Sequence, residues 1–99
     1  MRARENKEIW LSRRIIFSDD AWAEYLHWQE ADRKTVKKIN ALIKECQRTP
    51  ETGTGRPEQL RFDYSGWWSR RIDEENRLVY RFDDDALEIA QCRYHYKRD

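Results

Sequence analysis

The feature that most restricts the fold of this chain is a change in the spacing of its apolar residues, from a helical period to a strand period. Before about residue 48 the apolar side chains recur as on one face of a helix, and after about residue 60 they alternate. The intervening segment 51–58 contains Gly53, Gly55 and Pro57, which predict a loop. This order predicts an α+β fold with two N-terminal helices packed on one face of a mainly antiparallel sheet.

Helix boundaries are indicated by capping residues. Ser18 is a favourable N-cap and two aspartates follow it, so we expect a first helix that runs to about Glu30. Asp32 can cap a second helix that continues to about Arg48 and stops before Pro50.

The second helix has an apolar face and a basic face. The apolar face predicts packing on the core. The basic face has two interpretations, a solvated surface or a ridge that contacts RNA backbone, and the pattern alone favours the solvated surface. The basic residues are Lys34, Lys37, Lys38, Lys44 and Arg48.

Alternating segments separated by short turns predict an antiparallel meander. We expect its strands at residues 60–63, 67–72, 77–82 and 86–96, and a further short strand at 13–17, which makes a sheet of four to five strands. Residues 1–14 are interpreted as an N-terminal extension, either partly disordered or the result of an upstream start. Residues 15–99 are expected to form a single domain.

Composition excludes several classes of protein. The net charge is only +1 although 39% of the residues are charged, so the whole chain lacks the basic footprint of a strongly cationic nucleic-acid-binding domain. Cys46 and Cys92 have no metal-ligand spacing and are interpreted as reduced core thiols. No apolar run is long enough for a membrane span or a signal peptide, and we therefore expect a cytoplasmic protein.

Arginine is abundant in the predicted sheet, and aromatic residues lie between the arginines. Because an unpaired arginine is unfavourable to bury, we expect several on the uncovered sheet face. Acidic turns could neutralise them, or the open face could bind RNA phosphates and stack on bases, which we favour. The arginines are Arg61, Arg70, Arg71, Arg77, Arg81 and Arg93, and the rings are Trp67, Trp68, Tyr80 and Tyr94.

Metal-free cleavage of RNA needs a general base for the 2′-hydroxyl, a general acid for the 5′-oxygen and a cation for the phosphoryl oxygens. Glutamate, histidine and arginine can supply these roles, and histidine is readily protonated close to neutral pH. Of the two histidines, His27 is interpreted as a packed helix residue, whereas His95 is either a frayed terminal residue or a catalyst. The residue types alone are a weak signal.

Blocks of sequence are more specific than residue types. They are WAEYLHWQEAD and KKINALIKECQRTP in the helices, then GRPEQLR, SGWWSRRIDEENRLVYRF and the ending CRYHY. From about Arg14 to Tyr96 the chain resembles the YoeB (also called Txe) toxins of the RelE superfamily. The resemblance implies an endoribonuclease that cleaves messenger RNA in the A site of the 70S ribosome, on two helices packed against a twisted sheet.

The resemblance also implies roles for individual residues. Glu58 would be the general base, Arg77 would stabilise the transition state, and His95 would be the general acid. Tyr96 would help to position the substrate. No metal or other cofactor is expected. The predicted RNA-binding residues are Arg61, Arg70, Arg71, Lys37 and Lys38.

The family further implies a YefM-like antitoxin with a disordered C-terminal segment that wraps the toxin, and a possible homodimer. The sequence departs from the family pattern at Gln59, where a proline is usual, at Arg61, where a lysine is usual, and at Asn76, where a histidine is usual. None of these positions belongs to the trio of Glu58, Arg77 and His95.

Two other functions stay open on the sequence. ParE-like relatives share the architecture and inhibit DNA gyrase, but they lack the Glu58, Arg77 and His95 set. A ribosome- or RNA-binding module without catalysis, acting with its antitoxin, is the second alternative.

Overall fold

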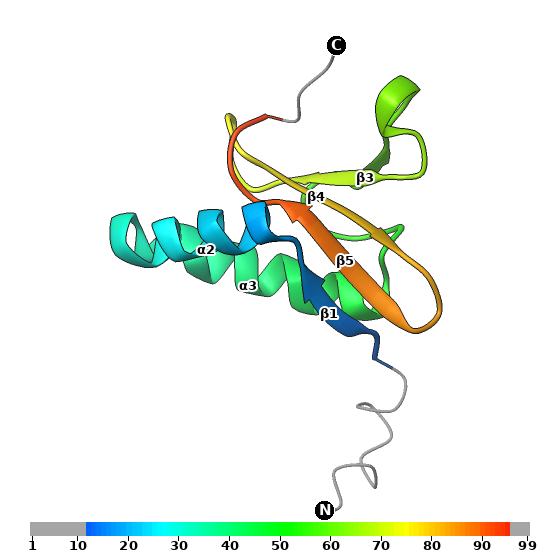
Figure 1. The fold of residues 1–99 in the computed structure, drawn as a ribbon, viewed down its shortest axis with the longest axis horizontal. Coiled ribbons are helices and arrows are strands. Elements are labelled where there is room, and N and C mark those ends of the chain that lie inside the picture. Colours follow the sequence, from blue (N-terminus) through cyan, green and yellow to red (C-terminus); the bar gives the residue numbers. More distant parts are fainter. Residues whose placement is uncertain (1–11, 96–99) are drawn as a thin grey trace, which may run out of the picture.

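The computed structural model describes residues 12–95, which form two helices packed on a five-stranded sheet (Figure 1). The strand order is β1-β5-β4-β3-β2, with β1 parallel to β5 and every other pair antiparallel. The predicted α+β architecture is therefore confirmed. The elements are β1 Arg14–Phe17, α2 Asp19–Ala31, α3 Arg33–Arg48, β2 Glu58–Gln59, the 3-10 turn η2 Phe62–Tyr64, β3 Trp68–Arg71, β4 Arg77–Phe82 and β5 Ala86–Gln91.

Both helices begin where the capping residues predict. The Ser18 hydroxyl accepts a hydrogen bond from the Ala21 amide at 3.0 Å. The Asp32 carboxylate accepts bonds from the amides of Lys34 and Thr35, and these satisfy donors that a helix start otherwise leaves without partners. A hydrogen bond from the Thr35 hydroxyl contributes most to lowering the pKa of Asp32 below its ordinary value.

The core lies between the helices and one face of the sheet. Ile39, Leu42, Leu78 and Leu87 are almost completely buried there, together with other apolar and aromatic side chains. Cys46 and Cys92 are free thiols in this layer, and burial raises their pKa to about 11 and about 12 respectively. The interpretation of both cysteines as unpaired core residues is confirmed.

Two predicted strand boundaries are wrong. The segment 60–63 is not a strand: pairing with β3 occurs earlier, at Glu58 and Gln59, and the chain turns at Phe62, which has a left-handed φ of 59°. The last strand ends at Gln91 rather than at residue 96. The next amide, that of Cys92, bonds to the Glu24 carboxylate at 2.8 Å instead of continuing the ladder.

Most of the predicted N-terminal extension is not described by the structure, so the boundary of the domain stays a prediction. Residues 1–11 of the expected extension lie outside the described residues. Arg13 belongs to the fold, because its guanidinium donates to the backbone carbonyls of Asp83 and Gln47, and the Gln47 side-chain amide donates to the Arg13 carbonyl.

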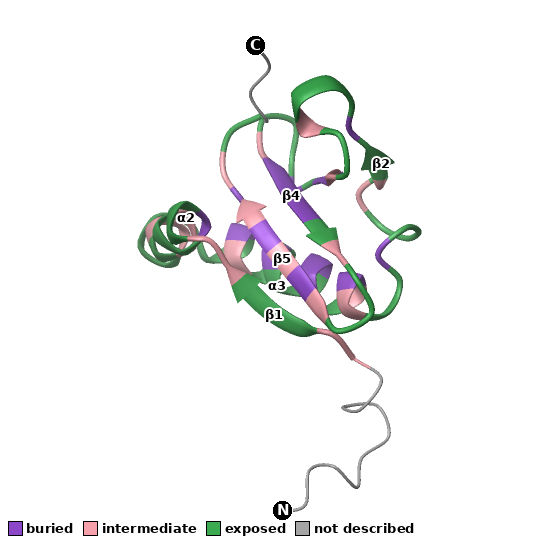
Figure 2. Cartoon of the chain, turned by 45° about the vertical axis from the view of Figure 1, so that its right-hand side comes forward, coloured by how far each residue is buried: buried purple, intermediate pink, exposed green. Residues whose placement is uncertain are grey.

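The register of the sheet separates a helix-covered face from an open face. Directly opposed residues of antiparallel strands point to the same face. Trp68 opposes Tyr80, and Tyr80 opposes Ile89, so all three share the helix-covered face. Their neighbours along each strand point the other way. In Figure 2 the sheet is seen from the side on which β5 lies in front of α3.

Candidate active site

The open face brings together Glu58 and two arginines from three neighbouring strands. Glu58 of β2 opposes Ser69 of β3, and Arg71, two residues further along β3, opposes Arg77 of β4. All four side chains therefore project from the face that the helices leave uncovered. Glu58 and Arg71 are exposed, whereas Arg77 is only 8% exposed.

The opposition of Arg71 and Arg77 places two positive charges directly across a strand pair, with the Asp73 carboxylate as a charged neighbour of Arg77. Like charges directly opposite each other in an antiparallel pair destabilise a sheet. An anion placed between two guanidinium groups relieves this repulsion, and phosphate oxygens match their fork of donors. The pair is consequently suited to a phosphate group on the open face.

Arg77 is held in place by its own turn. Its Nη1 donates to the carbonyls of Asp73, Glu74 and Asn76 at 2.8, 3.2 and 3.1 Å. Within the described part of the chain, no acceptor is assigned to Nε or Nη2. The guanidinium is thus anchored through Nη1 by the carbonyls of its own turn.

The segment that carries His95 is attached to the start of β4. The Arg77 amide donates to the Tyr94 carbonyl at 2.9 Å, and the Tyr94 amide donates to Oδ1 of Asn76 at 2.6 Å. The Gln91 side-chain amide adds a bond of 3.0 Å to the Tyr94 carbonyl. His95 is exposed and follows directly on this fixed residue.

Three residues other than glycine have a left-handed backbone among those the structure describes, and all lie beside candidate site residues. They are Arg56, two residues before Glu58, then Phe62, and Tyr94, directly before His95. Such conformations are unfavourable for residues with a Cβ and persist only where surrounding contacts hold them. They cluster at functional sites, so this strain independently marks the same region.

Arg70 does not lie on the open face, and the prediction that it binds RNA is wrong. It opposes Leu78 on the helix-covered face and has no exposed surface. Its guanidinium bonds to Glu45, Tyr80 and three backbone carbonyls, so it cannot reach a phosphate.

The predicted layer of aromatic rings is only partly present on the open face. Tyr80 is fully buried and Trp68 packs against the core, so these two rings are not available to bases. Trp67 lies under the Arg81 guanidinium, 4.5 Å from the ring centroid. Phe62, which the sequence interpretation did not select, is the large apolar side chain with the greatest exposure in the described residues, at 82%.

A family model described as a YoeB-like toxin of a bacterial type II toxin–antitoxin system matches residues 17–96 of the chain. The chain belongs to this family. It is 58% identical to toxin YoeB of Escherichia coli K12 over 83 residues, which cover 84% of this chain and 99% of the relative.

Solved structures agree with this assignment. A structure described as the YoeB dimer from Staphylococcus aureus superposes with a TM-score of 0.80 at 45% identity, covering 86% of this chain and 99% of that one. A YoeB–YefM complex from the same species gives a TM-score of 0.78 at 45% identity and covers 85% and 98% of the two chains. The predicted family and fold are thus confirmed.

The other predicted RNA-binding residues of this YoeB-like toxin lie on two different elements of the fold. Arg61 is exposed directly after Leu60, next to β2. Lys37 and Lys38 are exposed on α3, on the helical side of the sheet, so any RNA contact there is separate from the Glu58, Arg77 and His95 region. Tyr96 lies outside the described residues.

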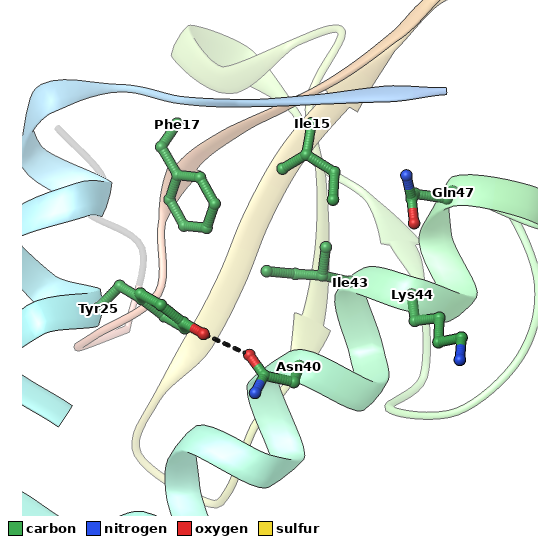
Figure 3. Close-up of a pocket in the computed structure, with 7 residues that line it drawn as sticks. All are labelled: Ile15, Phe17, Tyr25, Asn40, Ile43, Lys44 and Gln47. Atoms are coloured by element: carbon green, nitrogen blue, oxygen red, sulfur yellow. Dashed lines mark hydrogen bonds between the residues drawn. The ribbon is translucent and has the colours of Figure 1, made fainter. Parts of the chain in front are cut away.

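A separate cavity of about 300 Å³ lies on the helical side of this YoeB-like domain, between β1, α2 and α3 (Figure 3). Its lining is mostly apolar, and a hydrogen bond of 2.6 Å joins Tyr25 to Asn40 across it. It contains none of the open-face residues. Among the described residues there is no cluster of three potential metal ligands, and no helix is long and apolar enough to cross a membrane.

Proposed function

We propose that this YoeB-like toxin is a metal-independent endoribonuclease that cleaves messenger RNA in the A site of the 70S ribosome. The main support is the sheet register, which places Glu58 and Arg77 on one open face while a backbone bond joins Arg77 to the segment of His95. Membership of the YoeB family also supports this type of reaction.

The proposed reaction is an internal transfer. The Glu58 carboxylate accepts the proton of the 2′-hydroxyl, whose oxygen attacks the adjacent phosphorus and forms a cyclic phosphate. The bond to the 5′-oxygen breaks, and protonated His95 donates its proton to that leaving oxygen. Arg77 donates hydrogen bonds to the phosphoryl oxygens as their negative charge increases in the transition state.

Each role is consistent with the local environment. Glu58 is exposed and can reach a substrate on the open face. Arg77 is anchored through Nη1 by three turn carbonyls, so it needs little reorganisation when charge develops. Arg71, opposite Arg77, is proposed to hold a neighbouring phosphate, and Arg61 and Tyr96 to contact the RNA chain near the scissile bond.

The proposed partners follow from the relatives. A YefM-like antitoxin is proposed to bind and inhibit the toxin, because S. aureus YoeB is described in complex with YefM. Self-association is proposed because a YoeB dimer is described for the same species. Action on ribosomes places the proposed activity in the cytoplasm.

Cleavage of a defined messenger in a reconstituted translation system tests the proposal. We expect cuts in the ribosome-bound message with wild-type toxin and a much slower, still measurable cleavage with a folded Glu58→Gln, Arg77→Ala or His95→Gln protein. If folded wild-type toxin binds ribosomes but does not cut the message, the catalytic proposal is wrong and a binding module is favoured.

A further inference from the structure

Arg70 is the most completely bonded charged group described in the fold. Its side chain is fully buried, and all five guanidinium donors have acceptors. Nε donates to the Tyr80 hydroxyl at 3.1 Å. Nη1 donates to the Glu45 carboxylate and to the Thr54 carbonyl, and Nη2 donates to the carbonyls of Thr49 and Thr52 at 2.6 and 2.7 Å.

Tyr80 and Glu45 extend this network to the rest of the same loop. The Tyr80 hydroxyl donates to the Pro50 carbonyl at 2.6 Å. The Glu45 carboxylate accepts bonds from the amide and the hydroxyl of Thr54 at 2.7 and 3.1 Å. Although burial opposes its charge, hydrogen bonds and neighbouring groups raise the pKa of Arg70 above its ordinary value, so the arginine stays charged.

The loop is shaped to fit closely around this cation. Gly53 has a φ of 123°, and a Cβ at this position would collide with the Glu45 carboxylate. Gly55 has a φ of 87°, and a Cβ there would lie 3.0 Å from the Arg71 carbonyl. The two glycines that predicted the loop are therefore needed for its approach to α3 and β3.

The loop then leads directly into the strand that carries Glu58. The Arg71 amide donates to the Gly55 carbonyl at 2.7 Å, and three residues later Glu58 opposes Ser69. Strand β2 has only two residues and lies at the edge of the sheet, so its own pairing gives it little stability. Its position depends also on what holds the chain on either side: the Leu60 amide donates to the Trp67 carbonyl at 2.9 Å after the strand, and loop 49–55 precedes it.

We propose that Arg70, with Glu45, is a positioning residue that fixes loop 49–55 and thereby sets the place of Glu58 on the open face. The inference rests on the proposed function, in which Glu58 is the general base. Arg70 contacts the loop and not the RNA. A neutral or shorter side chain at this position would leave three loop carbonyls without their common donor.

Kinetics in a double-mutant cycle test the functional part. Arg70→Lys keeps the charge but concentrates three donors on one atom, so it cannot bind every acceptor. We expect kcat for cleavage of ribosome-bound message to fall by about tenfold or more, with KM changed by less than about twofold. In the Glu58→Gln background the same substitution should have almost no further effect, because the base it positions is already absent.

Control variants separate positioning from general damage. Glu51→Ala removes an exposed carboxylate from the same loop outside the network and should leave kcat unchanged. If Arg70→Lys does not fold, Glu45→Ala replaces it, because it keeps Arg70 and its bonds to the loop carbonyls and removes only the partly exposed carboxylate. An equal fall in kcat with and without Glu58→Gln would overturn the proposal.

Hydrogen exchange tests the loop independently of cleavage. The amides of Thr54 and Arg71 should be protected in the wild-type toxin and should exchange much faster in Arg70→Lys or Glu45→Ala, while protection in the middle of α3 is retained. Unprotected Thr54 and Arg71 amides in the wild-type toxin would contradict the proposal that Arg70 and Glu45 fix loop 49–55. If these amides behave as expected but Glu58→Gln cleaves normally, the assigned base is wrong, not the anchoring of the loop.

Discussion

The Arg77 amide donates a hydrogen bond to the Tyr94 carbonyl, 2.9 Å away, so the first residue of β4 is joined to the residue directly before His95. Asn76 strengthens this junction, because its Oδ1 accepts the Tyr94 amide while its side-chain nitrogen donates to the Asp73 carboxylate. The proposed acid and the proposed transition-state cation are therefore placed by one turn.

Replacement of Arg77 should impair chemistry more than folding. Arg77→Ala is expected to lower the cleavage rate more than tenfold, which corresponds to more than about 1.4 kcal/mol of transition-state stabilisation. Arg81→Ala is the matched control, because Arg81 lies on the same strand and face but pairs with Glu88. Single-turnover cleavage on ribosomes measures both variants, and melting curves establish that they fold. Equal rates for Arg77→Ala and the wild type would remove Arg77 from the mechanism.

The nucleophile is tested on the RNA rather than on the protein. A message with a single 2′-deoxy nucleotide on the 5′ side of the cut should resist cleavage completely, because the attacking oxygen is missing. Primer extension on the modified and unmodified messages, bound equally to ribosomes, gives the comparison. Cutting of the deoxy message would point to direct hydrolysis by water and to a different set of residues.

Asn76 offers a test of the junction. Asn76→Ala removes the acceptor of the Tyr94 amide and should reduce the cleavage rate by about tenfold through a less fixed His95. The comparison variant is Asn76→His, which introduces the residue usual in the family and should retain most of the activity. Rates that are unaffected by Asn76→Ala would show that the turn does not position the acid.

Stability should depend on pH through Glu45. Burial alone would raise the pKa of this carboxyl, but hydrogen bonds from Thr54 and Arg70 outweigh burial and lower the pKa below its ordinary value of 4.5. The stabilisation is therefore complete above the ordinary pKa and is lost as the pH falls through the lower folded value. Urea unfolding from pH 7 down to about pH 3 should give a less steep decline for Glu45→Gln than for wild type. Parallel curves would mean that Glu45 contributes nothing to the acid sensitivity.

Local signals in the sequence predicted the helices and the last two turns well. Ser18 and Asp32 cap the helices where expected, because capping depends on residues adjacent in sequence. The 77–82 strand agrees with β4 in both bounds. The limits of β2 and β5 were missed because they depend on distant partners, such as the Glu24 carboxylate that takes the Cys92 amide.

The sequence supplies candidate site residues, which stay a prediction, but it does not predict their surroundings. Glu58, Arg77 and His95 were identified through the family resemblance. Arg70 and Arg71 are adjacent in sequence and chemically identical, so only the sheet register could show that one is buried against α3 and the other is exposed. The same register places Tyr80 in the core. Alternation along a strand predicts two faces, but it does not say which of them the helices cover.

Primer extension on one defined message, with wild-type toxin beside His95→Gln and with ribosomes present or absent, tests the central claim most directly. RNA incubated without ribosomes, with and without EDTA, shows whether any cleavage of free RNA needs a metal ion. We expect cuts at positions in the A site that require ribosomes and that form much more slowly with the folded His95→Gln protein. Cuts by His95→Gln at wild-type strength, or no cuts by the folded wild-type toxin on ribosomes, would contradict the account.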